Sequence, residues 1–93
     1  MNTAKKAVLI HPKDNVAVVL EDVGKGEGVL YWYRRKRYFV VARDSVAKGH
    51  KVALRPIARN SVVKKYGIPI GRAIKAIKRG QLVHIDTMVS FVR

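Results

Sequence analysis

The sequence predicts a small all-β domain, and three observations lead to this prediction. Short runs of β-branched and aromatic residues alternate with turns at intervals of about ten residues, a pattern typical of small β-barrels and sandwiches. The chain has 93 residues, so we expect residues 1–93 to fold as one domain. Apolar residues make up 48% of the chain although its net charge is +14, which indicates cations arranged around a folded core.

The expected strands are the apolar runs between turn signals. In chain order they are residues 7–10, 16–20, 29–33, 38–42, 51–54, 62–65, 82–85 and 88–92. Turns are expected where Gly, Pro, Asn or Asp gather, because Gly supplies positive φ and Pro fixes φ. These turns fall at residues 12–15, 24–28, 34–37, 48–50, 59–61, 67–69 and 78–80. Residues 70–77 are ambiguous, and flanking Gly and Pro favour extended structure with at most a short helical turn.

Two of the turn phrases resemble each other. Ala47-Lys48-Gly49 and Ile77-Lys78-Arg79-Gly80 each precede a segment of alternating apolar residues. This similarity hints at a repeated β unit, although x-Lys-Gly is also a common turn and two copies are too few for a solenoid.

The composition excludes several classes of protein. Cysteine is absent, which excludes disulfide frameworks, thiolate zinc sites and cysteine nucleophiles, and favours a reducing compartment. The longest apolar runs are far shorter than the roughly 20 residues of a membrane span, and no signal-peptide core is present. We therefore expect a soluble, cytoplasmic protein without a membrane partner. No nucleophile elbow, phosphate loop or dinucleotide-binding motif occurs, so we expect no catalysis by the isolated chain.

The histidines are the first candidates for chemistry. His84 and Asp86 lie two positions apart, so in a strand they would share a face and could meet one ligand or metal ion. Two groups do not complete a metal site, and His50, Asp14 or a partner chain would have to add ligands. An exposed hydrogen bond between His84 and Asp86 is the simpler alternative.

Two lysine phrases could bind a small anion. His50 and Lys51 present an imidazole and an ammonium group together, which could hold a carboxylate or hydroxyl, although a solvated loop tip is the alternative. Lys65 and Tyr66 offer two donors ahead of Gly67, where a backbone can approach a ligand closely. Chance could also produce that tripeptide.

A third candidate is the segment 31–39, in which aromatic residues flank four consecutive cations. Stacking surfaces beside cations are typical of single-strand nucleic-acid binders, so we keep nucleic acid as an alternative partner. Its contact residues would be Trp32, Tyr33, Arg34, Arg35, Lys36 and Arg37. The same residues also describe a plain β-hairpin with Tyr31 and Tyr33 on one face, Trp32 on the other and the cations at its tip.

Four phrases then occur in a fixed order. They are Asp14-Asn15-Val16-Ala17, Gly49-His50-Lys51-Val52-Ala53-Leu54, Lys65-Tyr66-Gly67-Ile68-Pro69-Ile70-Gly71 and Gly80-Gln81-Leu82-Val83-His84. Together they resemble the small SAF-type domain of the altronate and galactarate dehydratase family, over residues 10–88. Each phrase alone is weak, but their order and spacing argue against coincidence.

The resemblance implies a β-clip fold and a role in a sugar-acid dehydratase, either as its N-terminal part or as a separate small subunit. Because the chain ends at Arg93, we expect the small subunit, with a large dehydratase subunit as partner. In this family a base removes the proton α to the carboxylate, and a divalent metal stabilises the enediolate while hydroxide leaves. We therefore expect Fe or Mn in the assembled enzyme, none in the isolated chain, and a sugar acid or hydroxy acid as substrate. The family includes a sulfolactate lyase, so the leaving group need not be water. A homo-oligomer, and a sugar-acid-binding domain without lyase activity, stay open as alternatives.

The resemblance also implies roles for particular side chains. His50 and His84 would act as acid, base or metal ligand. Substrate would be bound by Lys51, Lys65, Tyr66, Gly67 and Gly71, and His84 with Asp86 would contact the metal. Many relatives have His-x-His followed by Asn where this chain has His84-Ile85-Asp86-Thr87, so a carboxylate here replaces an imidazole. The basic hairpin is not part of the resemblance and is a natural place for docking on an acidic large subunit.

Overall fold

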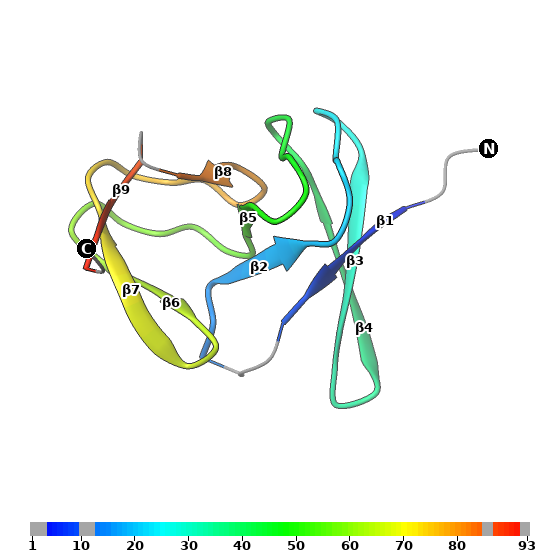
Figure 1. Ribbon diagram of the computed structural model, residues 1–93, viewed down its shortest axis with the longest axis horizontal. Helices are drawn as coiled ribbons and strands as arrows, with labels where there is room; N and C mark the ends of the chain where they lie inside the picture. The colour runs from blue at the N-terminus through cyan, green and yellow to red at the C-terminus, as the bar shows by residue number, and fades with distance from the viewer. Residues whose placement is uncertain (1–3, 10–12, 85–86, 92–93) are drawn as a thin grey trace.

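The computed structural model describes residues 4–9, 13–84 and 87–91, and this part of the chain is all-β, as predicted. Its strands are β1 (Lys5–Val8), β2 (Val16–Val19), β3 (Gly28–Tyr33), β4 (Lys36–Val41), β5 (Lys51–Ala53), β6 (Val62–Lys65), β7 (Ile68–Ala73), β8 (Leu82–Val83) and β9 (Met88–Ser90) (Figure 1). The described residues contain no helix of the length and apolar character that a membrane span requires.

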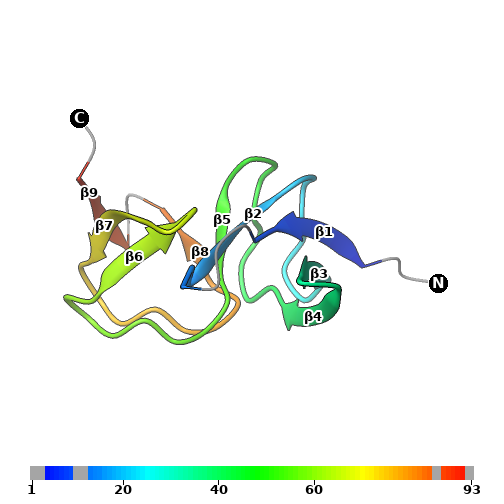
Figure 2. The same ribbon diagram turned by 90° about the horizontal axis from the view of Figure 1, so that it is seen from below.

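The strands form two sheets. One has six strands in the order β4-β3-β1-β2-β5-β8, and the other has three in the order β6-β7-β9. Within the described strands, β1 and β3 pair in parallel and the remaining pairs are antiparallel. Figure 2 shows β1, β3 and β4 at one end of the molecule, β6, β7 and β9 at the other, and β2 with β5 between them.

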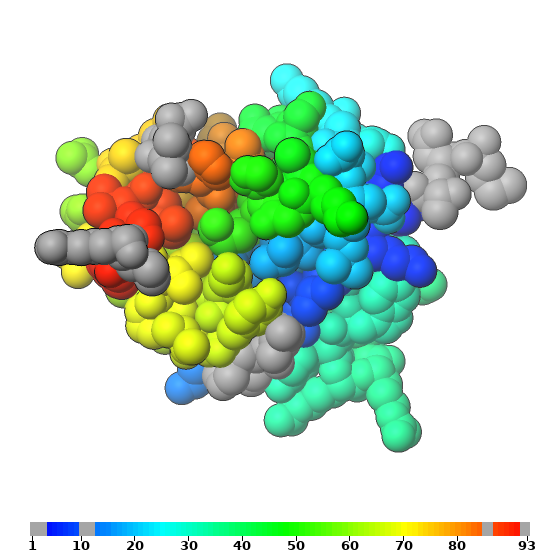
Figure 3. Space-filling model, viewed as in Figure 1, coloured from blue at the N-terminus to red at the C-terminus, as the bar shows by residue number. Residues whose placement is uncertain are grey.

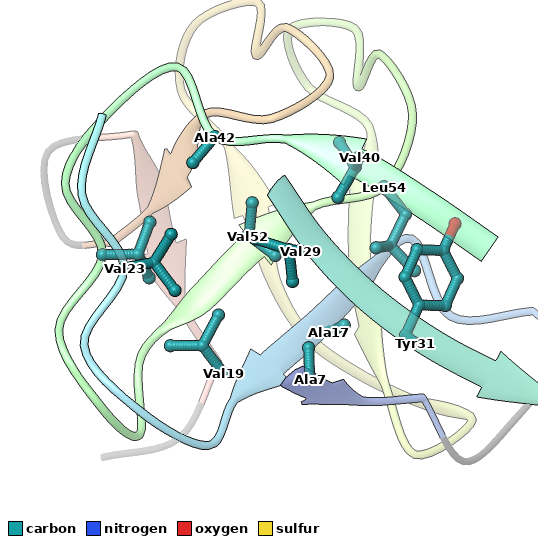
Figure 4. Packing of buried hydrophobic residues seen from close by; sticks show 11 residues of the cluster. Ala7, Ala17, Val19, Val23, Val29, Tyr31, Val40, Ala42, Val52 and Leu54 are labelled. Atoms are coloured by element: carbon teal, nitrogen blue, oxygen red, sulfur yellow. The ribbon is translucent and has the colours of Figure 1, made fainter. Parts of the chain in front are cut away.

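The central strands β2 and β5 contribute to two hydrophobic cores. Val19 and Val52 pack into the first core, with β1, β3 and β4 (Figure 4). Val16 and Ala53 pack into the second core, with β6 to β9. Successive side chains of a strand point to opposite faces, so the apolar runs of β2 and β5 can fill both cores at once. This explains why these two strands are apolar at nearly every position.

A short turn recurs four times in the described chain, which extends the repeat suggested by residues 47–49 and 77–80. Each copy contains a residue with positive φ, and the residue after it donates its N–H to the carbonyl of the residue three positions before the donor. The residues with positive φ are Gly26, Gly49, Asn60 and Gly80. The sequence hides the copy at Asn60 because Asn replaces Gly as the residue that tolerates this conformation. The apolar residues ahead of the turns pair as isolated bridges, Val23 with Val46 and Ile57 with Ile77. Each bridge closes the base of one hairpin, β3–β4 or β6–β7.

The second hairpin corrects the prediction of a turn at residues 67–69. The turn residues are Tyr66 and Gly67, with φ of 57° and 76°, and Ile68 and Pro69 already belong to β7. Positive φ at both central residues matches the right-handed twist of a two-residue hairpin. Proline has no N–H to donate to a neighbouring strand. Pro69 is accommodated because the pairing register shifts between Val63 and Lys64, and the regular hydrogen bonds between strands are interrupted at such a bulge.

Other boundaries differ less. The expected turn at 34–37 is shorter, because only Arg34 and Arg35 have positive φ and β4 begins at Lys36. The first strand runs over Lys5–Val8 rather than 7–10. The ambiguous segment is extended up to Ala73, without a helical turn. Residues 10, 85 and 92, included in the expected strands, lie outside the described residues.

The turn glycines Gly26 and Gly80 provide a test of this packing. Both have a φ of 89°, but a Cβ at Gly26 would meet nothing, whereas a Cβ at Gly80 would collide with the carbonyl oxygen of Val41. We expect Gly26→Ala to lower the free energy of unfolding by about 1 kcal/mol, from backbone strain alone. Gly80→Ala should lower it by about 3 kcal/mol, because overpacking adds to the strain. Equal losses for the two variants in urea denaturation would contradict the close approach of Gly80 to β4.

Candidate functional site

The rings of His50 and His84 lie together, with centroids 4.9 Å apart and planes inclined by 34°. The register of β5 and β8 explains this contact. Lys51 is paired with Val83, so the next position outward places His50 opposite His84. The backbone holds His50 on both sides, because its N–H donates to the Ala47 carbonyl and its carbonyl accepts from Val19, at 2.9 and 3.0 Å.

The Nδ1 atom of His50 is buried and makes no hydrogen bond to any described residue. A buried polar atom without a partner is unfavourable by about 1–3 kcal/mol, and native proteins contain few of them. The His50 ring therefore lacks the hydrogen bond at Nδ1 that would fix its tautomer.

His84 is held by a tight turn rather than by a strand. Its N–H donates to Thr87 Oγ1 at 3.0 Å, and its carbonyl accepts from the backbone N–H groups of Thr87 and Met88. Strand β8 ends at Val83, so the strand alternation expected to put His84 and Asp86 on one face stops before either residue. Asp86 itself lies outside the described residues, and its role as a metal ligand stays a prediction.

Lys51 and Lys65 form the second pair. Lys51 is half-buried at the start of β5, and burial lowers the pKa of its ammonium group below the ordinary value of 10.5. The positive charge of Lys65 lowers this pKa further. Within the described residues, neither lysine forms an ion pair with a carboxylate. The two ammonium groups thus create a positive site that is available to an anion.

The side chains of Asp14 and Asn15 position the hairpin that carries Lys65. Asp14 is only 1% exposed, and its carboxylate accepts hydrogen bonds from the N–H groups of Tyr66 at 2.8 Å and Gly67 at 2.7 Å. Asn15 accepts from the N–H of Lys64 and donates to the Val62 carbonyl. No group of three His, Cys, Asp or Glu side chains gathers within the described residues, so Asp14 does not join the histidines in a metal site. The first of the four phrases is therefore a structural clamp.

The remaining expected substrate contacts lie on the same hairpin. Tyr66 is exposed, and its ring lies 5.3 Å from the Lys65 Nζ. The close approach expected at Gly71 is made by the chain itself, because a Cβ there would collide with the Val89 carbonyl and with Met88 on β9. Contact of Gly67 or Gly71 with substrate stays a prediction. On the face shown in Figure 3, the segment around residue 50 (green) borders that around residue 83 (orange) and the β6–β7 hairpin (yellow).

The basic hairpin β3–β4 has the expected faces. Tyr31 and Tyr33 line one side of a pocket of about 240 Å³, whereas Trp32 is 44% exposed on the opposite face. Tyr31 stacks on Tyr38 with ring centroids 5.3 Å apart. Burial raises the pKa of the Tyr31 hydroxyl, and the charges of nearby arginines partly offset this effect. Arg34 and Lys36 lie over the rings of Tyr33 and Tyr38, respectively.

Comparisons with known proteins fit the four phrases and the fold. A family model described as the altronate/galactarate dehydratase SAF domain matches residues 5–90. The chain is 44% identical to the altronate dehydratase of Escherichia coli (strain K12) over 77 residues, which are 83% of this chain and 15% of that protein. It is 38% identical to the altronate dehydratase of Bacillus subtilis (strain 168) over 81 residues, which are 87% of this chain and 16% of that protein. It is 34% identical to the (2R)-sulfolactate sulfo-lyase subunit alpha of Chromohalobacter salexigens over 85 residues, which are 86% of this chain and 89% of that subunit.

The fold and the matches define a small β-clip domain of the SAF type. The chain belongs to the altronate/galactarate dehydratase SAF domain family, which confirms the resemblance seen in the sequence. It spans only 15–16% of the length of the altronate dehydratases that it matches, but most of the sulfo-lyase subunit alpha. The chain is thus similar both to a small part of long dehydratases and to most of a short lyase subunit.

The coupling between Lys51 and Lys65 can be measured in the free protein. We expect the pKa of the Lys51 ammonium to lie below its ordinary value of 10.5, because burial and Lys65 both disfavour its charged form. Lys65→Met should raise the pKa of Lys51 part of the way towards its ordinary value, since burial remains. Titration of lysine side-chain signals by heteronuclear NMR measures both effects. A Lys51 pKa that is unchanged by Lys65→Met would contradict the pairing of the two lysines.

Proposed function

We propose that this chain is the small subunit of a lyase that dehydrates a sugar acid or a related hydroxy acid. It supplies polar side chains to an active site whose other residues belong to a separate large subunit. The observation that carries this proposal is the contact between the rings of His50 and His84, and the uncompensated ammonium groups of Lys51 and Lys65 support it. The similarity to a lyase subunit of nearly the same extent supports the two-chain arrangement.

The lysines suit the carboxylate that every sugar acid carries. Burial is the main cause of the lowered pKa of Lys51, and repulsion by the ammonium group of Lys65 adds to it. A bound carboxylate would relieve this repulsion and accept charge-assisted hydrogen bonds from both groups. Tyr66, exposed beside Lys65, adds a hydroxyl that can hydrogen-bond a sugar hydroxyl.

The imidazoles suit the proton transfers of dehydration. A base takes the proton from the carbon α to the carboxylate, the C–O bond at the next carbon breaks, and the departing hydroxyl takes up a proton to leave as water. Imidazole can act as the base or the acid near neutral pH. The rings of His50 and His84 are in contact, and the Thr87 turn holds the backbone of His84.

The divalent metal expected from the family, Fe or Mn, does not fit the described residues of this chain alone. These residues bring two imidazoles together but assemble no group of three ligating side chains. We therefore propose that the large subunit holds the metal in the assembled enzyme, and we derive no step of the reaction through it.

Reconstitution tests this function. Turnover of altronate, galactarate or sulfolactate should require both this chain and a dehydratase-type large chain from the same organism, each purified without the other. Once they are mixed, His50→Gln and Lys51→Met should each lower kcat or kcat/KM by about 10²-fold or more, the typical effect of losing an acid–base or anion-binding group. The matched control is Lys25→Met, at an exposed turn, which should leave turnover unchanged.

Turnover by the small chain alone would contradict the two-chain proposal. If the His50→Gln and Lys51→Met chains each gave full activity when mixed with the large chain, this chain would take no part in the chemical steps. If the wild-type chain nevertheless bound the sugar acid in calorimetry, it would be a binding domain without lyase activity, and the proposal would be wrong.

A further inference from the structure

The β3–β4 hairpin is apolar on both of its faces. Val29 and Val40 point into the first core. On the opposite face, Trp32, Phe39 and Val41 are 44%, 50% and 47% exposed. The solvent face of an antiparallel sheet normally carries polar residues, because every second side chain of a strand points away from the core. An apolar pattern on both faces indicates that the second face is also covered when the protein acts.

The exposed apolar face continues across the neighbouring strands. Leu30 is paired with Phe39 on one side and with Lys6 of β1 on the other. Leu20 continues this row, since its N–H donates to the Lys6 carbonyl at 2.9 Å and its side chain is 49% exposed. Side chains of directly paired residues project from the same side of a sheet. We define the outer face as Leu20, Leu30, Trp32, Phe39 and Val41.

The Phe39 ring of the outer face packs on the backbone of Gly28. A Cβ at Gly28 would collide with the Phe39 ring, so the absence of a side chain at Gly28 lets that ring lie across β3. The contact with the Gly28 backbone restricts this ring, which lowers the entropy that docking would have to overcome.

The charges of the hairpin that carries most of the outer face are of one sign, whereas at the Leu20 edge the exposed Glu21 accepts from the Lys6 N–H and pairs with Lys5. Residues 28–41 contain four cations and no acid; the cations are Arg34, Arg35, Lys36 and Arg37, and all are exposed. Arg37 is paired directly with Trp32, and the exposed Lys6 lies in the row described above. The complementary surface therefore has an apolar centre and carboxylates around it.

This arrangement favours a protein over single-stranded nucleic acid. Nucleic-acid grooves combine cations that follow the backbone with free aromatic rings for successive bases. Here three of the five outer-face residues are aliphatic, and most of the cations gather at the hairpin tip. The rings of Tyr33 and Tyr38 are covered by Arg34 and Lys36 of the same hairpin.

We propose that the outer face docks on a protein surface with an apolar centre bordered by Asp and Glu side chains. In the assembled enzyme this surface belongs to the large subunit, a step that rests on the proposed function. Docking buries Trp32, the single tryptophan of the chain.

Titration calorimetry with the large dehydratase-type chain of the same organism tests the docking. Phe39→Ser should raise Kd by about tenfold or more, as expected for an aromatic side chain at the centre of an interface. Arg37→Glu should weaken binding most at low salt and reduce its salt dependence. Val89→Ser is the matched control, because Val89 is 55% exposed on β9, away from the outer face, and its loss should leave Kd unchanged.

A label at Trp32 gives a second readout that does not depend on the stability of the variants. With 5-fluorotryptophan in this chain only, addition of the large chain should shift the ¹⁹F signal and reduce its sensitivity to a soluble quencher. The large chain could bind folded Phe39→Ser with an unchanged Kd and leave the ¹⁹F signal unshifted. These two results together would overturn the docking but leave the proposed function intact.

Absence of any affinity between the two chains would instead overturn the proposed function. If the fluorine signal responded only to oligothymidylate, the outer face would bind nucleic acid. If it responded only to the concentration of this chain itself, the outer face would bind a second copy. Either result would overturn docking on the large subunit.

Discussion

The buried carboxylate of Asp14 and the amide of Asn15 hold the second hairpin against the body of the molecule, and the candidate site depends on this attachment. Their contacts link residues 47 to 53 positions apart. Burial of a carboxylate is unfavourable unless it is hydrogen-bonded, and the two backbone N–H donors of the hairpin turn satisfy that condition. The turn is thereby fixed, and Lys65 just before it is held where its charge acts on Lys51.

The candidate site is built where strands end. His50 precedes β5, His84 follows β8 and Lys65 ends β6, so each side chain has a rigid strand behind it and lies outside the two cores. Strands β2 and β5 contribute to both cores and fix the relative positions of these ends. Rigid support makes the geometry of a site reproducible, but it does not complete the site. The uncompensated lysines are groups that an anionic substrate can satisfy.

Local patterns predicted much of the fold, and long-range pairing limited the rest. Alternation of apolar and polar residues is local, so it located most strands and the opposite faces of Tyr31 and Trp32. Residues 70–73 of β7 were expected to be extended, but its start at Ile68 and Pro69 was predicted as a turn because Gly67 and Pro69 are typical of turns. The bulge that accommodates Pro69 depends on pairing with β6. The family resemblance named His50 and His84, but their contact follows from the β5–β8 register, which the sequence does not specify. The clamp by Asp14 also escaped prediction, because its partners lie on a distant hairpin.

Chemical footprinting of the lysines tests the central claim that Lys51 and Lys65 face a pocket completed by another chain. Reductive methylation, read by peptide mass spectrometry, compares their modification rates in the free chain, in the assembled enzyme and in the assembled enzyme with substrate. Exposed Lys25 and Lys78 serve as internal references. The expected result is slower modification of Lys51 and Lys65 on assembly and slower still with substrate, at constant reference rates. Unchanged modification of both lysines in an active, substrate-saturated complex would contradict the claim.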